Sequence, residues 1–435
     1  MAVFDTGPID NRDAPRTTQL TIRLFNTGRL SALVGIEVYQ INPPGGGFTS
    51  ETVYVVSLVP LNPFGTPDSG FTLDNVFADL DVFGVRVLTS GLGANDIAIT
   101  VLEKDSAGQI IEKHVLEGEL SRIQELLFAY VTNFGNDSVT VINTATNTIV
   151  TTIPLPDGSN PEGIAITPDG SRAYVANTLS DTVTIINTAT NTILTTISLP
   201  DDSFPKGVAI TPDGSRAYVT NFGNDTVTVI NTATNTILTT IILPDGSDPA
   251  GIAITPDGSR AYVTNSGTPD SVTVINTATN TILTTIPLPD GSNPEGIAIT
   301  PDGSRAYVTN FGNDTVTVIN TATNTILTTI ILPAGNPAGI AITPDGSRAY
   351  VTNSGMPDSV TVINTAINSI LTTIHLPAGT DPFGIAITPD GSRAYVANNN
   401  DESVMALDTA INGVIATLPA EFNASGIAIT PILLF

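Results

Sequence analysis

The amino-acid sequence predicts an all-β protein in which a seven-bladed β-propeller with 3+1 ring closure follows an N-terminal β-sandwich or jelly-roll domain. The first observation is a motif, AYVTN or AYVAN, that returns every 43 to 45 residues. Its tyrosines are Tyr130, Tyr174, Tyr218, Tyr262, Tyr307, Tyr350 and Tyr395. The second observation is that each repeat holds four short apolar runs. The third is that the array starts with the second of these runs and ends with an extra copy of the first.

Residues 1–125 lack the repeat and are predicted to form the β-sandwich domain with a linker, whereas residues 126–435 form the propeller. Alternating apolar runs such as Leu20–Phe25, Ala32–Ile41 and Val82–Leu88 are separated by turns rich in Gly and Pro. Short strands at this spacing are typical of an antiparallel sandwich or jelly roll. The linker segment Glu117–Phe128 fits a short helix or a strand equally well.

Three segments of this first domain carry a resemblance to a known family. The runs NTG at Asn26, ETVYVV at Glu51 and ITVLEKD at Ile99 resemble small jelly-roll subunits of bacterial spore appendages. Members of that family use N-terminal cysteines to bond neighbouring subunits, and this chain contains no cysteine. The resemblance therefore does not extend to covalent assembly of that type.

One repeat, Gly251–Leu288, shows how a blade is built. Its apolar runs, called strands A to D, are Gly251–Thr255, Ala261–Asn265, Val272–Asn276 and Thr281–Ile286. The turn TPDG joins A to B and has the Pro and Gly positions of a type I turn, and NTATN joins C to D. The unit is an antiparallel meander with two apolar faces, which radial closure buries against the sheets on either side.

The order of the strands predicts how the ring closes. Seven copies of strand A begin at a glycine, and the last of them is Gly426–Thr430. The array begins with strand B at Ala129–Asn133, so the last strand A is free to complete the first blade and remove two open sheet edges.

Five AYVTN, two AYVAN and six TPDGSRAY copies resemble the YVTN β-propeller repeat family over about residues 126–431. The resemblance implies the propeller fold. It also implies a surface-layer or secreted protein, because members are commonly of that kind and most have no assigned activity. Related propellers include lactonase-like enzymes.

Charge and hydropathy exclude several partners. The formal net charge is −26, and residues 126–435 carry 25 acidic and 7 basic residues. Such a field repels nucleic-acid phosphates and anionic membranes, so we expect no nucleic-acid partner. No run reaches the roughly 18 apolar residues of a membrane span, and no Sec-type signal is visible at the N-terminus. We expect a cell or spore surface location without a conventional signal peptide, with a cytoplasmic location as the alternative.

The sequence offers little for catalysis or metal binding. Its only histidines are His114 and His375, too few for a typical zinc site without cysteine. The TPDGS and NFGND turns hold one Asp each, short of the six to eight oxygens that calcium prefers. Asp257 and Arg260 in one TPDGSR copy are near enough in sequence for a local surface ion pair, and we interpret them as turn residues with a role in solubility. We therefore predict no catalytic residues, no metal and no cofactor.

The two faces of the disc differ in sequence. The uniform face carries the TPDGS and NTATN turns, which hardly change between copies. The variable face carries the B–C loops and the D–A links, and we predict that a partner docks there around the channel mouth. The predicted partner-binding residues precede the strand-A glycines or lie in the B–C loops: Glu162, Lys206, Ala250, Glu295, Ala338, Phe383, Ser425, Phe134, Phe222 and Phe311.

From the near-identical repeats we predict a non-enzymatic surface or assembly protein. In this interpretation the propeller is a rigid binding disc, the N-terminal domain is an anchor or polymerisation module, and the partner is another protein or a second copy. The sequence identifies no small-molecule ligand. The first alternative is a lactonase-like hydrolase that uses Glu162 and Glu295 at the channel mouth, with or without a divalent cation. The second is a cytosolic protein-binding hub.

Overall fold

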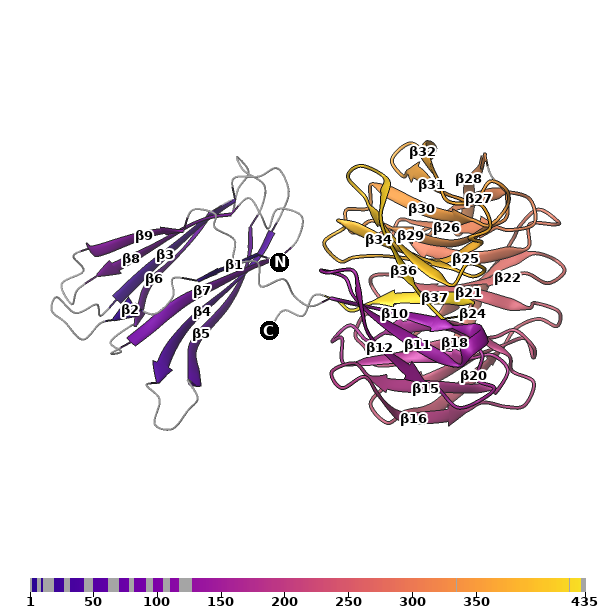
Figure 1. Cartoon of the computed structure of the whole chain (residues 1–435), viewed down its shortest axis with the longest axis horizontal. Coiled ribbons are helices and arrows are strands. Elements are labelled where there is room, and N and C mark those ends of the chain that lie inside the picture. Colours follow the sequence, from indigo (N-terminus) through magenta and orange to yellow (C-terminus); the bar gives the residue numbers. More distant parts are fainter. Residues whose placement is uncertain are drawn as a thin grey trace. The chain divides into compact units, whose positions relative to one another are not determined.

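The computed structural model describes nine strands between residues 2 and 116, together with residues 127–431 except 334 and 422. The chain divides into two compact units, one that includes Met1–Glu125 and one formed by Leu126–Leu433 (Figure 1). No helix in the described ranges has the length and hydropathy that a membrane crossing requires.

The N-terminal unit contains two antiparallel sheets. The first has the order β1 (Ala2–Asp5), β7 (Val82–Ser90), β4 (Ala32–Asn42) and β5 (Ser50–Leu61), with β2 (Ile9–Asp10) also paired to β7. The second has the order β6 (Gly70–Phe77), β3 (Gln19–Asn26), β8 (Ile97–Lys104) and β9 (Ile110–Leu116). The segments that connect these strands lie outside the described residues, as does most of Glu117–Phe128. The jelly-roll topology and the nature of the linker therefore stay predictions.

The second unit is the predicted seven-bladed propeller, and every blade is a four-stranded sheet (Figure 1). From the inside outward, blade 1 consists of β37 (Ala424–Ile429), β10 (Phe128–Asn133), β11 (Ser138–Asn143) and β12 (Thr148–Pro154). Blade 2 consists of β13 (Pro161–Ile166), β14 (Arg172–Asn177), β15 (Thr182–Asn187) and β16 (Thr192–Ser198). Blade 3 consists of β17 (Pro205–Ile210), β18 (Arg216–Asn221), β19 (Thr226–Asn231) and β20 (Thr236–Ile242).

The remaining blades follow the same plan. Blade 4 consists of β21 (Pro249–Ile254), β22 (Arg260–Asn265), β23 (Ser271–Asn276) and β24 (Thr281–Pro287). Blade 5 consists of β25 (Pro294–Ile299), β26 (Arg305–Asn310), β27 (Thr315–Asn320) and β28 (Thr325–Ile331). Blade 6 consists of β29 (Pro337–Ile342), β30 (Arg348–Asn353), β31 (Ser359–Asn364) and β32 (Ser369–His375). Blade 7 consists of β33 (Pro382–Ile387), β34 (Arg393–Asn398), β35 (Ser403–Asp408) and β36 (Gly413–Pro419).

The ring closes as the strand order predicts. The C-terminal strand β37 pairs antiparallel with β10, with Tyr130 opposite Ala428, and so becomes the inner strand of the first blade (Figure 1). Because the first and last segments share one sheet, blade 1 has no gap and the ring has no seam between neighbouring blades.

The core lies between the blades. One cluster combines Tyr262, Val272 and Val274 of blade 4 with Val308 and Ile319 of blade 5, all of them buried. Equivalent clusters fill the other interfaces, and the seven repeat tyrosines are the largest fully buried side chains described. Both faces of each sheet are covered, as the two apolar faces of the repeat require.

Polar contacts between blades repeat along the uniform face. Tyr262 donates its hydroxyl hydrogen to Asn324 Oδ1 at 2.6 Å, and Arg260 Nη1 donates to Thr321 O at 2.6 Å in the next blade. Asp257 instead accepts hydrogen bonds from Thr255 Oγ1 at 2.5 Å and Ser259 N at 2.9 Å. Asp257 therefore acts within its turn, as the sequence indicated, but Arg260 reaches across the interface between blades instead of forming a local ion pair with it.

Candidate functional site

The variable face opens onto a cavity of about 140 Å³ at the channel mouth. Each blade contributes a pair of residues to its lining, a variable residue followed by a glycine. The variable residues are Glu162, Lys206, Ala250, Glu295, Ala338, Phe383 and Ser425. The structure thus brings together all seven positions that the sequence placed before the strand-A glycines.

Local backbone geometry explains why a glycine follows each variable residue. The inner strands carry a β-bulge at this pair; in blade 4, for example, the register shifts between Pro249 and Ile252. A Cβ atom on Gly207 would lie 2.5 Å from Ala250 O in the next blade, which leaves no room for a side chain. The glycine therefore makes the contact between blades, and the residue before it is free to differ from blade to blade.

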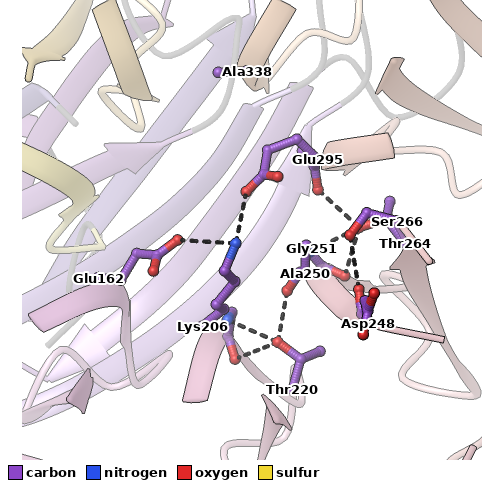
Figure 2. Close-up of polar contacts among 12 residues, drawn as sticks. Glu162, Lys206, Thr220, Asp248, Ala250, Gly251, Thr264, Ser266, Glu295 and Ala338 are labelled. Atoms are coloured by element: carbon purple, nitrogen blue, oxygen red, sulfur yellow. Dashed lines mark hydrogen bonds and ion pairs between the residues drawn. The ribbon is translucent and has the colours of Figure 1, made fainter. Parts of the chain in front are cut away.

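A threonine hydroxyl ties most of these glycines to the neighbouring blade. Thr264 Oγ1 accepts a hydrogen bond from Gly251 N at 2.7 Å and donates to Glu295 O at 2.8 Å (Figure 2). This threonine is the T of AYVTN, and Ala176 and Ala397 replace it in the two AYVAN blades. The carbonyl groups of Lys206 and Ser425 consequently receive no such hydroxyl hydrogen bond. The difference between T and A in the motif was a visible signal that the sequence reasoning did not use.

Aspartates of the B–C loops hold the D–A links that lead into the site. Asp181 accepts hydrogen bonds from the backbone N–H of Asp202 at 3.0 Å and of Phe204 at 2.8 Å, just before Lys206. Asp137 accepts equivalent bonds from Gly158 N and Asn160 N, at 2.7 and 2.6 Å, in the link that precedes Glu162. The sequence indicated Asp137 only as the single aspartate of an NFGND turn and did not single out Asp181, because the partners of both lie in another loop.

The charged side chains of the site come from three blades. Lys206 Nζ lies 3.9 Å from Glu162 Oε1 and 4.0 Å from Glu295 Oε1, so the ammonium group stands between two carboxylates (Figure 2). These separations are charge pairs rather than hydrogen bonds. Lys206 Nζ also lies 4.5 Å from the centroid of the Phe222 ring, within the range of a cation–π contact. All three charged side chains keep about a fifth of their surface exposed.

This arrangement shifts two pKa values. Burial raises the pKa of the Glu162 carboxyl above its ordinary range; Lys206 opposes the shift, and the negative charge of Glu295 reinforces it. Burial alone would lower the pKa of Lys206, but the carboxylates of Glu295 and Glu162, together with Asp248, outweigh it and raise that pKa. Near neutral pH the site therefore holds a charged ammonium group beside a carboxylate with an increased affinity for a proton.

The other predicted residues divide into two groups. Ala250, Ala338, Phe383 and Ser425 line the rest of the cavity with small or apolar surface. Phe134 and Phe311 occupy the position of Phe222 in blades 1 and 5, where their backbone N–H groups donate to Asn423 O and Asn293 O. They support the loops of the variable face but do not line the cavity.

Within the described propeller, neither histidine nor a metal-binding cluster stands at the channel mouth. His375 lies exposed at the end of the outer strand β32, away from the inner strands that line the channel. Within the part of the chain that the structure describes, no three His, Asp or Glu side chains gather in the way that a metal ion requires.

Comparisons with known proteins agree with the fold. Residues 124–281, 195–331 and 245–426 match the sequence model of a family described as "Lactonase, 7-bladed beta-propeller". No curated protein matches the chain significantly.

Solved structures match the propeller with low sequence identity. A provisionally named 6-phosphogluconolactonase from Bacteroides fragilis has a TM-score of 0.60 and 19% identity over 72% of this chain and 99% of its own. A protein of unknown function from Desulfotomaculum acetoxidans has a TM-score of 0.60 and 21% identity over 70% and 99% of the two chains. Hydrazine synthase from Kuenenia stuttgartiensis has a TM-score of 0.57 and 24% identity over 62% and 89%. At such identities these likenesses establish the fold alone.

The family match overturns the functional prediction made from the sequence. A non-enzymatic surface or assembly protein, and with it the statement that the chain is not an enzyme, is contradicted by the match to a lactonase family. The prediction failed because it assumed that near-identical repeats cannot build an asymmetric site. One variable residue in each blade is enough, since all seven meet at the channel mouth.

Proposed function

The chain belongs to the seven-bladed β-propeller lactonase family, and on that premise we propose that it hydrolyses a lactone at the channel mouth. The observation that carries the proposal is the Lys206 ammonium group held between Glu162 and Glu295 at the wall of the cavity (Figure 2). The finer assignment to the YVTN branch of propellers rests on the repeated AYVTN motif and is part of the same proposal.

Lys206 is suited to stabilise the negative charge that develops on a lactone carbonyl oxygen. Its pKa is raised, so the ammonium stays charged near neutral pH. Its neighbours Glu162 and Glu295 lie beyond hydrogen-bond distance, which leaves the N–H groups free to turn to a carbonyl oxygen. A positive charge fixed at this point stabilises the tetrahedral intermediate more than the ground state.

Glu162 is suited to act as general base. Its raised pKa lies closer to neutral than that of an ordinary carboxyl, which is where a base works best. Thr178 Oγ1 lies 3.3 Å from Glu162 Oε2, but its shorter hydrogen bond, at 2.9 Å, goes to Pro205 O, so the Glu162 carboxylate is available to a water molecule. Glu295 pairs with Lys206 from the opposite side and so positions the ammonium group rather than transferring a proton.

The reaction proceeds in two steps. Glu162 takes a proton from a water molecule as the water oxygen bonds to the lactone carbonyl carbon, and the carbonyl electrons move to the oxygen beside Lys206. The intermediate then collapses, the ring C–O bond breaks, and the proton held by Glu162 passes to the departing ring oxygen. The product is a hydroxy acid, and Glu162 is again ionised.

A lactonase assay tests the proposal. Hydrolysis of a panel of five- and six-membered lactones is followed in a pH-stat, in EDTA and with added divalent cations. We expect Lys206→Met to lower kcat/KM about 10²–10³-fold and Glu162→Gln to lower it about 10²–10⁴-fold. Asp245→Asn removes an exposed carboxylate in the link before β21 and serves as the matched control with unchanged activity. Wild-type protein that hydrolyses no lactone, or a Glu162→Gln/Glu295→Gln double variant with full activity, would refute the proposal.

A further inference from the structure

We propose that the substrate is an uncharged lactone, one that carries no phosphate or other anionic group. This inference rests on the proposed function and specifies its substrate class. The cavity wall holds two carboxylates, Glu162 and Glu295, and one ammonium group, Lys206. The lysine charge is already matched by its neighbours, and Asp248 adds a further negative potential at the ammonium group. A bound anion would therefore meet net repulsion.

No other cation of the propeller is available at this face. Residues 126–435 contain seven basic residues, and the six besides Lys206 are the arginines that begin β14, β18, β22, β26, β30 and β34. Each of these guanidinium groups donates to a C–D turn of the next blade on the uniform face. The B strands are six residues long and span roughly 17–20 Å, so the arginines lie at the far ends of the strands from the cavity.

Most of the glycine N–H groups at the cavity, another common source of phosphate ligands, are also committed. The glycines that line the cavity in blades 1, 3, 4, 5 and 6 donate their N–H groups to threonine hydroxyls at 2.7 to 2.8 Å. Proteins bind phosphate with arginine forks, lysine clusters or several free N–H groups at a helix N-terminus or in a nest. Of these features, the described part of the cavity wall offers the single paired lysine and the N–H groups of Gly163 and Gly384, where alanine replaces the threonine. These two glycines come from blades that are not adjacent, so they do not form a nest together.

The remaining wall suits a neutral ring. Phe383 contributes a half-buried aromatic side chain to the part of the cavity that the charged residues leave open, and the neighbouring lining residues Ala250 and Ala338 are small and almost fully buried. Hydrolysis then changes the charge of the ligand, because the product carries a carboxylate. The same two glutamates that tolerate a neutral lactone repel this anion, which favours release of the product.

The experiment compares two lactones that differ only in a phosphate group: glucono-1,5-lactone and its 6-phosphate. We expect kcat/KM of the full-length protein to be at least tenfold higher for the neutral lactone. We also expect kcat/KM for the phosphorylated lactone to rise with added salt, because salt screens the repulsion, whereas the value for the neutral lactone stays constant.

Charge variants separate local from global effects. Glu295→Gln removes one carboxylate at the cavity and should raise the ratio of phosphorylated to neutral turnover by about threefold or more. Asp245→Asn removes the same charge away from the cavity and should leave the ratio unchanged. Equal or faster hydrolysis of the phosphorylated lactone would overturn the substrate class while supporting the lactonase activity. Failure to hydrolyse either of these lactones or any other of the panel would overturn the activity, and the substrate class with it.

Discussion

The uniform face and the variable face of the propeller are built from the same seven repeats but use them in opposite ways. On the uniform face, the Tyr–Asn contact between neighbouring blades recurs at every interface, for example between Tyr262 and Asn324 at 2.6 Å. On the variable face, five residue types occupy the seven positions before the strand-A glycines, and three charged side chains meet from blades 2, 3 and 5. The uniform face repeats one side-chain contact between blades, whereas the variable face gathers unlike side chains.

The difference shows what a repeat protein can change at little cost. A contact between blades must be kept at every interface, because each blade meets a nearly identical neighbour. At the channel, the glycine makes the close contact with the backbone of the next blade, so the side chain before it is not needed for packing between blades. Variation concentrated at this position can therefore build an asymmetric site without weakening the propeller.

The largest expected effect comes from exchanging one basic residue on each face for methionine. Lys206→Met should lower lactone kcat/KM about 10²–10³-fold, equivalent to about 2.7–4 kcal/mol, with little change in the free energy of unfolding. Arg260→Met should leave kcat/KM unchanged but lower the free energy of unfolding by about 1–2 kcal/mol. Its loss is moderate because the hydrogen bond from Tyr262 Oη to Asn324 Oδ1 at 2.6 Å still joins the same two blades.

Urea unfolding and lactone assays on both variants measure the two effects. Blade 1 already lacks this arginine, because Phe128 stands at its position, so a blade can form without the guanidinium contact. If Lys206→Met destabilised the protein as much as Arg260→Met, the separation of roles between the faces would be wrong.

A smaller effect should come from the threonine of AYVTN beside the channel. Thr264→Ala removes the hydroxyl that bonds Gly251 N and Glu295 O, and it should cost about 1–2 kcal/mol of stability. Ala176→Thr places the same hydroxyl next to the Lys206 carbonyl and should add about 0.5–1 kcal/mol. Thermal unfolding of the two variants and the wild type measures both changes in stability. Equal destabilisation by both changes would mean that blade 2 cannot accommodate the hydroxyl.

Much of the propeller could be predicted because its determinants are local. The spacing of Tyr130 and its repeats, the TPDG turns and the unpaired last strand A together determine blade number and closure. The position before each glycine could be identified as variable from the sequence alone, and the structure places all seven at the cavity.

What could not be predicted depends on contacts between blades. Arg260 follows Asp257 closely in sequence, so a local pair looked sufficient, but the neighbouring blade offers Thr321 O at hydrogen-bond distance. The approach of Lys206 to Glu295 depends on the curvature of the ring and on the length of the lysine side chain, since the two residues come from blades that are not adjacent. Neither the Arg260–Thr321 hydrogen bond nor the approach of Lys206 to Glu295 can be derived from one repeat. The functional prediction failed for a related reason, since the asymmetric site forms only where residues of several blades meet.

The smallest effect concerns acid, to which the two faces should respond with opposite sign. On the uniform face, hydrogen bonds from Thr255 and Ser259 lower the pKa of Asp257 below its ordinary value of 3.8. A lowered pKa means that the ionised form is favoured by folding, so its contribution to stability is present above that value and is lost as the pH falls through the folded pKa. On the variable face, burial raises the pKa of Glu162 above its ordinary value of 4.5. Protonation of Glu162 therefore favours the folded state, and that contribution is fully present below pH 4.5 and is lost as the pH rises through the raised pKa.

Activity should consequently be lost at a higher pH than stability when the solution is acidified from neutral pH. Activity needs the ionised form of Glu162, so kcat/KM should fall at a pH above 4.5 while the melting temperature is unchanged or slightly higher. Loss of stability should begin only below the ordinary aspartate value of 3.8. Calorimetric melting temperatures and kcat/KM measured in the same buffers test this order, and Asp257→Asn should reduce the acid sensitivity of stability without moving the activity profile. A common midpoint for both curves would show that acid inactivates the protein by unfolding the ring, and that the raised pKa of Glu162 does not control the site.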